Sequence, residues 1–439
     1  MKPGLERIAR LMEMMAEPQR GYPSVHISGS NGKTSTAWIT TSVLAAHGLT
    51  VGTFTSPHLE RVEERIALNG VPLAPQEFGA AIGDVEPFAE LLLRETGEQA
   101  TYFELVTAAA FAWFAERAVD VGVVEVGLGG RLDSTNVLRS EVAAVTGVSL
   151  EHTHVLGGAV AEIAAEKLAI CKPGSVLVTG ALPEDAERVA AARSAEVGAP
   201  WRRYGVDFHL ESAAMAVGGW RCDVAGVYHT YQDLHLQLHG RHQTRNLAVA
   251  LAACEELFGR ALSEEATRDG VRAARSPGRL EVVNRSPLVL LDGAHNPEAF
   301  EVLGRSLAEE FPDLPWRLVV GVLGDKDFGK MLSQVAGQVR EVFATAAISE
   351  RALPASQVAA AAREAFGSAV PVHEVATVPE AVTRALASSG PDDALLVSGS
   401  LYVVGEARTL LMGGRDRPPT ATIAGLDGQR VDGQADGGR

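Results

Sequence analysis

The sequence has few cysteines and no long apolar run. Its 439 residues include only three cysteines, Cys171, Cys222 and Cys254, which lie far apart in the chain. This spacing matches neither a cysteine metal cluster nor a disulfide framework, so we expect a reducing compartment. The N-terminal stretch MKPGLERIAR lacks an apolar signal core, and no apolar run approaches the roughly 20 residues that span a bilayer. We therefore expect a cytoplasmic protein with no membrane segment.

Positive charge is also scarce. The chain has 39 Lys and Arg against 55 Asp and Glu, which gives a net charge of −16 at pH 7. This excess of negative charge argues against nucleic acid or an anionic membrane as a partner. Local lysines, arginines, metal ions and helix N-termini must therefore hold any anionic substrate. With 46% hydrophobic and 21% charged residues, the composition suits a globular protein of two or three domains.

The first half of the chain alternates short apolar runs with longer helical patterns. Residues 24 to about 180 contain five strand-like runs, VHISGS, LTVGTFTS, VGVVEVGLGG, VAAVTGVSL and SVLVTGAL. Such runs, separated by helices, predict a mostly parallel sheet with both faces covered. Residues 201–240 instead alternate apolar and polar side chains in WRRYGVDFHL, AAMAVGGWRCDVA and VYHTYQDLHLQLHG. This pattern predicts a small antiparallel sheet.

After Pro287 the α/β alternation begins again. LVLLDGA, RLVVGVLGD, EVFATAAI and ALLVSGS are typical of strands, and EAFEVLGRSLAEEF and PEAVTRALASSG of helices. We therefore expect one domain over residues 1–283 and a second over 284–412. The last stretch, 413–439, is rich in Gly, Asp and Arg with little to bury, and we expect a disordered tail.

The stretch VHISGSNGKTST, residues 25–36, joins a strand-like run to the helical pattern TSTAWITTSVLAAHG. Gly29 and Gly32 would let the backbone approach a phosphate, and Lys33 would reach the terminal phosphates. A hydroxyl of Thr34 or of the next residue could bind magnesium. The usual phosphate loop needs a glycine at position 27, which is Ile27 here. The order of strand, loop, Lys-Thr and helix still favours nucleotide binding over a plain glycine turn.

Other polar stretches follow strands. In EVGLGGRLDSTN, Glu125 is placed to bind magnesium, and the GxGG spacing does not match a dinucleotide fingerprint. In SLEHTHVLGG, His152 could bind metal or have a structural role. In LLDGAHNPEAF, Asp292 and His295 end a strand-like run at the edge where ligands bind in open sheets, although Asp292 might equally cap the following helix. VSGSLYVVGEA repeats this layout with two serines, Ser398 and Ser400.

Together these motifs resemble the folylpolyglutamate synthase/dihydrofolate synthase family of the Mur ligase superfamily. The resemblance covers nearly the whole chain before the tail and keeps the family order: GSNGKT, SPHL…ERI, TYFE, EVGLGGRLDSTN, EHT…LG…IAAEKLAICKPG, SPGRLEVV, LDGAHNPEAF, GVLGDKD and SGSLYVVGEA. It implies a P-loop NTPase-like ATP-binding domain with a mostly parallel and a small antiparallel sheet. A Rossmann-like C-terminal α/β domain for glutamate ligation would follow.

The resemblance also implies roles for individual residues. Lys33, His152, Lys167 and His295 would be catalytic. The family resemblance assigns ATP binding to Gly29, Ser30, Asn31, Gly32, Lys33, Thr34, Asn246, Arg279 and Asp292. It assigns Mg2+ binding to Ser56, Glu125, His152 and a carbamylated Lys167. It assigns substrate binding to Thr101, Phe103, Asp133, His295 and Ser400.

The implied reaction has two steps. ATP phosphorylates a pteroate or folate carboxylate, and the amine of L-glutamate then displaces phosphate from this acyl phosphate. Because Thr101, Phe103 and Asp133 match positions that contact dihydropteroate in bifunctional members, we expect both dihydropteroate and reduced folates as acceptors. We also expect a monomer. The chain departs from the family at Thr34, where glycine is common, and at Glu151, where the usual residue is aspartate.

Two rival functions are less well supported by the sequence. A Mur ligase acting on a UDP-sugar peptide carries a UDP-binding domain before the ATP loop, and only 28 residues precede Gly29. A nucleotide-binding protein that joins no substrates is expected to carry a guanine-reading NKxD motif, and GDKD at 324–327 lacks the asparagine.

Overall fold

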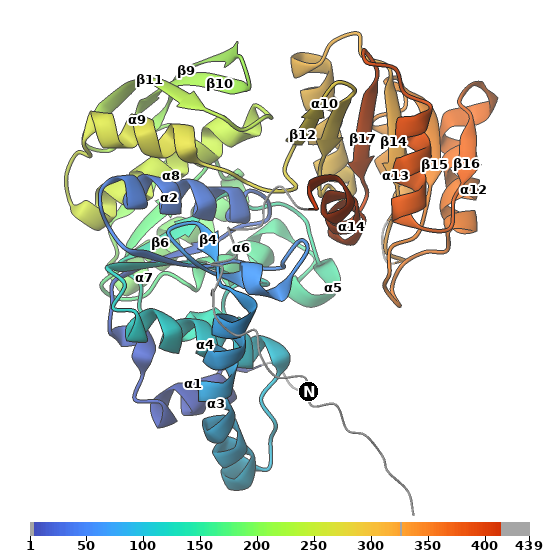
Figure 1. The fold of residues 1–439 in the computed structure, drawn as a ribbon. Coiled ribbons are helices and arrows are strands. Elements are labelled where there is room, and N and C mark those ends of the chain that lie inside the picture. Colours follow the sequence, from blue (N-terminus) through green and yellow to red (C-terminus); the bar gives the residue numbers. More distant parts are fainter. Residues whose placement is uncertain (1–3, 325–326, 414–439) are drawn as a thin grey trace, which may run out of the picture.

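The computed structural model describes residues 4–324 and 327–413 (Figure 1). The expected disordered tail, apart from its first residue, lies outside these ranges. Figure 1 shows two bodies, one built from residues up to about 275 and one from the C-terminal part of the chain. None of the described helices is both long and apolar enough to cross a bilayer.

The first body is built on an eight-stranded sheet with the strand order β4-β3-β2-β5-β1-β6-β7-β8. β1 lies in the middle and pairs in parallel with β5 and β6, while β3 and β4 add an antiparallel edge. The strands are β1 (Ser24–Ser28), β2 (Val51–Phe54), β3 (Ile66–Leu68), β4 (Val71–Pro72), β5 (Val121–Glu125), β6 (Val142–Val145), β7 (Val176–Thr179) and β8 (Trp201–Arg203). Every residue of β1, β2, β5 and β6 is buried, as expected for a parallel sheet covered on both faces. The predicted parallel sheet is confirmed.

Helices cover both faces of this sheet. One face packs on α2 and α8, and the helices of the first body pack into three apolar cores. The helices are α1 (Glu6–Met14), α2 (Lys33–Ala46), α3 (Pro75–Thr96), α4 (Tyr102–Glu116), α5 (Thr153–Leu156), α6 (Val160–Leu168), α7 (Glu184–Val197), α8 (His242–Phe258) and α9 (Glu264–Ala273), with 3-10 turns η1 (Pro18–Arg20), η2 (Val62–Arg65) and η3 (Ser134–Val137).

A three-stranded antiparallel sheet, in the order β11-β10-β9, follows in the chain. It comprises β9 (His209–Ala216), β10 (Gly219–Ala225) and β11 (Thr230–Leu236). The predicted antiparallel sheet is therefore confirmed, with one correction. Residues 201–203, which we expected in it, form β8 and pair in parallel with β7 at the edge of the large sheet. Three residues are too few for their alternation to indicate which sheet they join.

The second body has a six-stranded sheet in the order β12-β13-β17-β14-β15-β16. All pairs are parallel except β12 with β13. α10, α11 and α12 pack on one face, and α13 and α14 pack on the other. The elements are β12 (Glu281–Arg285), β13 (Leu288–Leu291), α10 (Pro297–Glu310), β14 (Trp316–Val320), α11 (Phe328–Ser333), β15 (Val339–Ala344), α12 (Ala355–Phe366), η4 (Gly367–Ala369), β16 (Val372–Glu374), α13 (Val378–Ala387), β17 (Ala394–Ser398) and α14 (Leu401–Met412).

Glu310 and Arg408 make two of the groups of contacts that join the bodies. Glu310 on α10 accepts hydrogen bonds from Trp220 Nε1 at 3.3 Å, from His239 Nδ1 at 2.9 Å and from the backbone amide of Gly240. On the other side, Arg408 on α14 forms ion pairs with Glu60 of the first body and with Glu281. Since β12 begins at residue 281, the expected boundary at 283/284 falls inside this strand, and the sheet pairing favours a boundary a few residues earlier.

Candidate active site

The phosphate-loop sequence lies between β1 and α2, as expected. Gly29 has φ +148° and Gly32 has φ +87°, a region that disfavours residues with a Cβ. A Cβ at position 29 would collide with Thr146 Oγ1, and one at position 32 would collide with Asn246 Oδ1. Both glycines are therefore required by the backbone conformation and by the close approach of β6 and α8.

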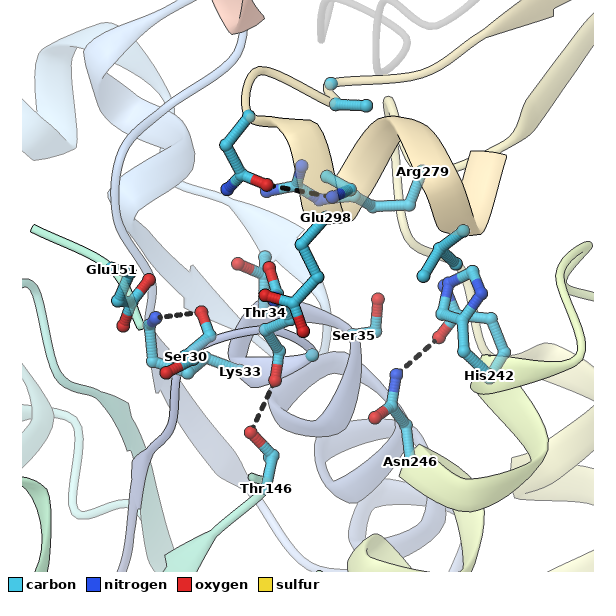
Figure 2. Close-up of a pocket in the computed structure, with 18 of the residues that line it drawn as sticks. Ser30, Lys33, Thr34, Ser35, Thr146, Glu151, His242, Asn246, Arg279 and Glu298 are labelled. Atoms are coloured by element: carbon cyan, nitrogen blue, oxygen red, sulfur yellow. Dashed lines mark hydrogen bonds between the residues drawn. The ribbon is translucent and has the colours of Figure 1, made fainter. Parts of the chain in front are cut away.

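Lys33 begins α2, and its ammonium folds back over the loop. Nζ donates a hydrogen bond to the carbonyl oxygen of Gly29 at 2.7 Å. It donates another to the carbonyl oxygen of Ser30 at 3.1 Å (Figure 2). The unpaired amides at the start of α2 and the helix dipole add to this positive potential. The loop is therefore arranged to receive an anion although Ile27 occupies the place of the usual first glycine.

Hard oxygen atoms gather beside the loop. Glu125 accepts a hydrogen bond from Thr34 Oγ1 at 2.8 Å and another from the backbone amide of Ser56 at 3.1 Å. Burial raises the pKa of Glu125, and the positive charge of Lys33 opposes this shift. Ser56 Oγ is buried and has no hydrogen-bond partner among the described residues. A carboxylate and two hydroxyls, one of them unsatisfied, are the ligand types that Mg2+ prefers, so these residues fit the expected ion.

The strand topology explains why these residues meet. Ser56 follows β2, Glu125 ends β5, Gly29 follows β1 and Thr146 follows β6. These four strands are parallel and neighbouring, so their carboxyl ends lie along one edge of the sheet. That edge is where open α/β sheets bind ligands.

Lys167 on α6 is buried beneath the loop. Its ammonium donates to Gly29 O at 3.0 Å and forms an ion pair with Glu151 Oε1 at 2.6 Å. Burial and the nearby Lys33 lower the pKa of Lys167 to about 8, while Glu151 opposes the shift. Burial tends to raise the pKa of Glu151, but Lys33 and Lys167 outweigh this and lower it. The residue that departs from the family pattern, Glu151, is therefore the partner of Lys167.

His152 lines the cavity described below and has φ +45° at the start of α5. Within the described part of the chain, no group of three or more His, Cys, Asp or Glu side chains is arranged to hold a metal. Of the residues expected to bind the metal, Ser56 and Glu125 are in contact with each other. The roles of His152 and Lys167 in metal binding remain predictions.

The second body contributes Arg279, Asp292 and His295. Asp292 accepts hydrogen bonds from the amides of Leu280 and Ala294, both at 2.9 Å. Burial raises the pKa of Asp292, and Arg279 opposes the shift. Asp292 therefore ties the interdomain segment to the start of the second sheet. The alternative that it caps the next helix is wrong, because the side chain of Asn296 caps α10.

His295 Nδ1 donates to Gly293 O at 2.8 Å. On the opposite side, Asn246 of α8 donates from Nδ2 to Gln243 Oε1 at 2.9 Å, as Figure 2 shows beside His242. Burial, with a contribution from Arg279, lowers the pKa of His242 to about 4. This ring is therefore neutral at pH 7.

Most of these groups surround one cavity of about 400 Å³ at the junction of the two bodies, but Gly29 and Lys167 do not line it. Of the predicted site residues, it is lined by Ser30, Asn31, Gly32, Lys33, Thr34, Ser56, Glu125, His152, Asn246, Arg279, Asp292 and His295. The cavity is also lined by residues outside the predicted set, namely Thr146, Tyr204, His242, Gln243, Arg245 and Glu298. The polar first turn of α8, HQTRN, before an apolar run was a signal for three of them.

The expected acceptor residues Thr101, Phe103 and Asp133 do not line the cavity. The Thr101 side chain caps α4, and Phe103 packs against Phe54 with ring centroids 5.9 Å apart. Asp133 accepts a hydrogen bond from the Leu128 amide at 2.9 Å. Phe103 and Asp133 meet at Gly127, where a Cβ would lie 2.6 Å from Phe103 Cζ and 3.0 Å from Asp133 Oδ2, and Gly127 lines the cavity.

Ser400 does not line the cavity either. It is buried, and its side chain accepts a hydrogen bond from the amide of Val403 at 3.2 Å, which caps α14. The next residue, Leu401, does line the cavity.

Comparison with known proteins identifies the family. Residues 27–254 match the Mur ligase middle domain and residues 278–401 match the Mur ligase glutamate ligase domain. A dihydrofolate synthase/folylpolyglutamate synthase of Mycobacterium tuberculosis is 37% identical over 94% of this chain and 91% of its own. The corresponding Bacillus subtilis protein is 33% identical over 93% and 95%. The chain belongs to the folylpolyglutamate synthase/dihydrofolate synthase family.

Solved structures of this family agree with the fold. A Mycobacterium tuberculosis folylpolyglutamate synthase complexed with ADP and AMPPCP has a TM-score of 0.89 and 38% identity, covering 95% of this chain and 96% of its own. An Escherichia coli protein in complex with DHPP and ADP has a TM-score of 0.83 and 31% identity, with 94% of each chain covered. The expected family, fold class and class of enzyme, an ATP-dependent ligase of the folylpolyglutamate synthase/dihydrofolate synthase family, are confirmed.

Proposed function

We propose that this ligase joins L-glutamate to the carboxylate of dihydropteroate and of reduced folates, with ATP as the phosphoryl donor. The observation that carries the proposal is the junction cavity. The phosphate loop and the Thr34, Ser56 and Glu125 side chains of one body line it together with Arg279 and His295 of the other. Such an arrangement suits a reaction in which one body activates a carboxylate and the other delivers the nucleophile.

In the first step the acceptor carboxylate attacks the γ-phosphate of ATP, giving an acyl phosphate and ADP. Two anions must meet, so the main demands are charge neutralisation and positioning. Lys33, the amides that start α2 and Arg279 supply positive potential on the cavity wall. Asn246 and His242 line the cavity at α8. We propose that Asn246 binds ATP from the first body and that Asp292 binds it from the second.

We propose that Ser56, Glu125 and Thr34, with His152, hold Mg2+. When bound there, the ion would neutralise phosphate charge. We also propose that Lys167 is carbamylated in the active enzyme. A pKa of about 8 leaves an appreciable neutral amine near pH 7.5, and only the neutral amine reacts with carbon dioxide.

In the second step the amine of L-glutamate attacks the acyl phosphate and phosphate leaves. We propose that His295 lies near the incoming glutamate and that the closed junction excludes water, which would hydrolyse the intermediate. Ser400 supports this wall by fixing the start of α14, since its neighbour Leu401 lines the cavity.

We propose both acceptor activities because Thr101, Phe103 and Asp133 match the positions that contact dihydropteroate in bifunctional family members. Phe103 and Asp133 also lie against Gly127, which lines the cavity. A decisive assay offers the purified protein ATP, L-glutamate and either dihydropteroate or tetrahydrofolate, and measures ADP and the glutamylated product. Product with both acceptors is expected. ADP release with tetrahydrofolate but not with dihydropteroate would contradict the proposed dihydrofolate synthase activity.

We also propose an oligomeric state, a cellular location and a domain division for the protein. A monomer is supported by a cavity lined within one chain, and light scattering would test it. A cytoplasmic location is supported by three buried, unpaired cysteines, and cell fractionation would test it. The division into a 1–283 and a 284–412 domain would be tested by limited proteolysis, where cleavage between residues 274 and 281 would favour the earlier boundary.

A further inference from the structure

Glu298 places a carboxylate from the second body against the phosphate-loop side of the cavity. It lies in the first turn of α10, and its Oε2 accepts hydrogen bonds from Asn31 Nδ2 at 3.2 Å and from Ser149 Oγ at 2.7 Å. Figure 2 shows its side chain extending from α10 toward the loop. The residue is exposed within the cavity, so a ligand can reach it.

The other carboxylates that line the cavity are committed elsewhere. Glu125 is held by Thr34 and the amide of Ser56. Glu151 is paired with Lys167, and both oxygens of Asp292 accept backbone amides. Glu298 differs because both of its hydrogen-bond donors are neutral side chains. Among the lining carboxylates only Glu298 is exposed, and it forms no ion pair with another described residue.

The reaction needs such a group. Glutamate arrives with a positively charged ammonium, and the nitrogen becomes a nucleophile only after losing a proton. The nitrogen must also lie close to the acyl phosphate, whose phosphate sits at the loop. Glu298 reaches the loop from the wall that carries His295, three residues before it in the chain.

We propose that Glu298 binds the ammonium of the incoming L-glutamate and accepts its proton. This inference rests on the proposed function and names the base for its second step. The ammonium gives one proton to the Glu298 carboxylate, and the resulting amine forms a bond to the acyl carbon. The bond from that carbon to the phosphate oxygen then breaks. A second proton leaves the nitrogen with the departing phosphate, and Glu298 returns its proton to solvent.

Several charged and titratable groups line the same cavity and set the field that Glu298 experiences. They are Lys33, Glu125, Glu151, His152, Tyr204, His242, Arg245, Arg279, Asp292 and His295. These groups would also surround an ammonium bound to Glu298.

The test uses E298Q in the full-length enzyme. Glutamine keeps the shape and can still accept the hydrogen bonds from Asn31 and Ser149, but it carries no charge and is not a base. We expect the KM for L-glutamate to rise about tenfold, as for loss of a charged hydrogen bond. We expect kcat to fall about 100-fold, as for loss of a general base, with the KM for ATP unchanged. The kcat deficit should shrink as the pH is raised from 7 to 9, because more glutamate already carries a neutral amine.

Hydroxylamine separates the two steps, since it is an uncharged nucleophile near neutral pH. E298Q should form the hydroxamate from ATP and acceptor at nearly the wild-type rate. The matched control is E301Q, one turn along α10, where Glu301 is exposed, pairs with Arg305 at 3.3 Å and lies outside the cavity lining; it should match wild type. S149A tests whether Glu298 serves only as an interdomain latch, because it removes the shorter of the two hydrogen bonds and keeps the charge.

Three results would overturn the inference: an unchanged kcat/KM for glutamate in E298Q, an equal loss with hydroxylamine, or an S149A variant as impaired as E298Q. A failure of the proposed function would look different. In that case the wild-type enzyme itself would yield neither ADP nor a glutamylated product with any pteroate or folate acceptor.

Discussion

The two walls of the cavity are built differently. On the wall from the first body, Glu125 and Ser56 are buried, and Gly32 has no room for a side chain. Lys167 and Gly29 do not line the cavity, but Lys167 is buried and Gly29 has no room for a side chain either. On the wall from the second body, His295 is half-buried and Glu298 is exposed. The first wall is therefore preorganised for phosphoryl transfer, whereas the second wall depends on how the two bodies meet. Variants on the first wall should stop the first chemical step, and variants on the second should act on delivery of glutamate.

The largest expected effect comes from Lys33→Ala. The substitution removes the ammonium that lies over the loop, so ADP formation should fall by about 1,000-fold, as when a preorganised charge at a developing anion is lost. The measurement is ADP release with saturating acceptor and glutamate. Thermal unfolding should show an intact fold.

Lys330→Ala is the control for Lys33→Ala, because Lys330 lies on α11 and does not line the cavity. Near-normal turnover of Lys33→Ala would show that the phosphate loop takes no part in the mechanism. The first wall could then not be called preorganised for phosphoryl transfer.

The second prediction concerns the buried pair of Lys167 and Glu151. The pKa of Lys167 is lowered from 10.5 to about 8, so between these values the unfolded chain binds more protons than the folded one. Stability should therefore rise with pH from about 8 to 10.5, by about 3 kcal/mol for a shift of this size. Urea unfolding in buffers free of magnesium and bicarbonate measures it.

The matched variant for that experiment is the double substitution Glu151→Gln and Lys167→Met, which leaves no unpaired buried charge. Its stability should show a smaller rise over the same pH range. Lys172, whose pKa burial also lowers to about 8, is retained in both proteins and cancels in the difference. Equal pH dependence in the two proteins would show that Lys167 is not held with a depressed pKa.

The third prediction addresses the junction itself. Glu310 is almost wholly buried and accepts three hydrogen bonds from the first body. Glu310→Ala should lower the free energy of unfolding by about 2 kcal/mol, because buried donors lose their acceptor. Glu309→Ala, which removes a more exposed ion pair with Arg241, should cost less than about 1 kcal/mol. Equal losses in the two variants would mean that Glu310 is no stronger a junction contact than a surface pair.

The sequence predicted the first wall better than the second, for a physical reason. Glu125, Ser56 and Gly29 follow neighbouring parallel strands, so strand order alone brings them to one edge. Glu298 and Lys167 could not be placed by strand order. Their contacts depend on how α10 and α6 pack against distant segments of the chain. The edge strand β8 was misassigned for a related reason, since three residues carry too little pattern to select a sheet.

The smallest expected effect separates two roles of Thr101. Its side chain accepts a hydrogen bond from the Glu104 amide at 3.1 Å, and its own amide donates to Glu104 Oε2 at 2.7 Å. As a helix cap alone, Thr101→Ala should cost about 1 kcal/mol of stability and leave the KM for dihydropteroate unchanged. As a substrate-binding residue it should also raise that KM, while the KM for ATP stays constant. Thr101→Ser keeps the capping oxygen and loses only the methyl group, so it should restore the stability. We expect the KM for dihydropteroate to rise in Thr101→Ala, because α4 carries Phe103 against Gly127 at the cavity wall. If that KM is unchanged while stability falls, Thr101 acts only as a helix cap.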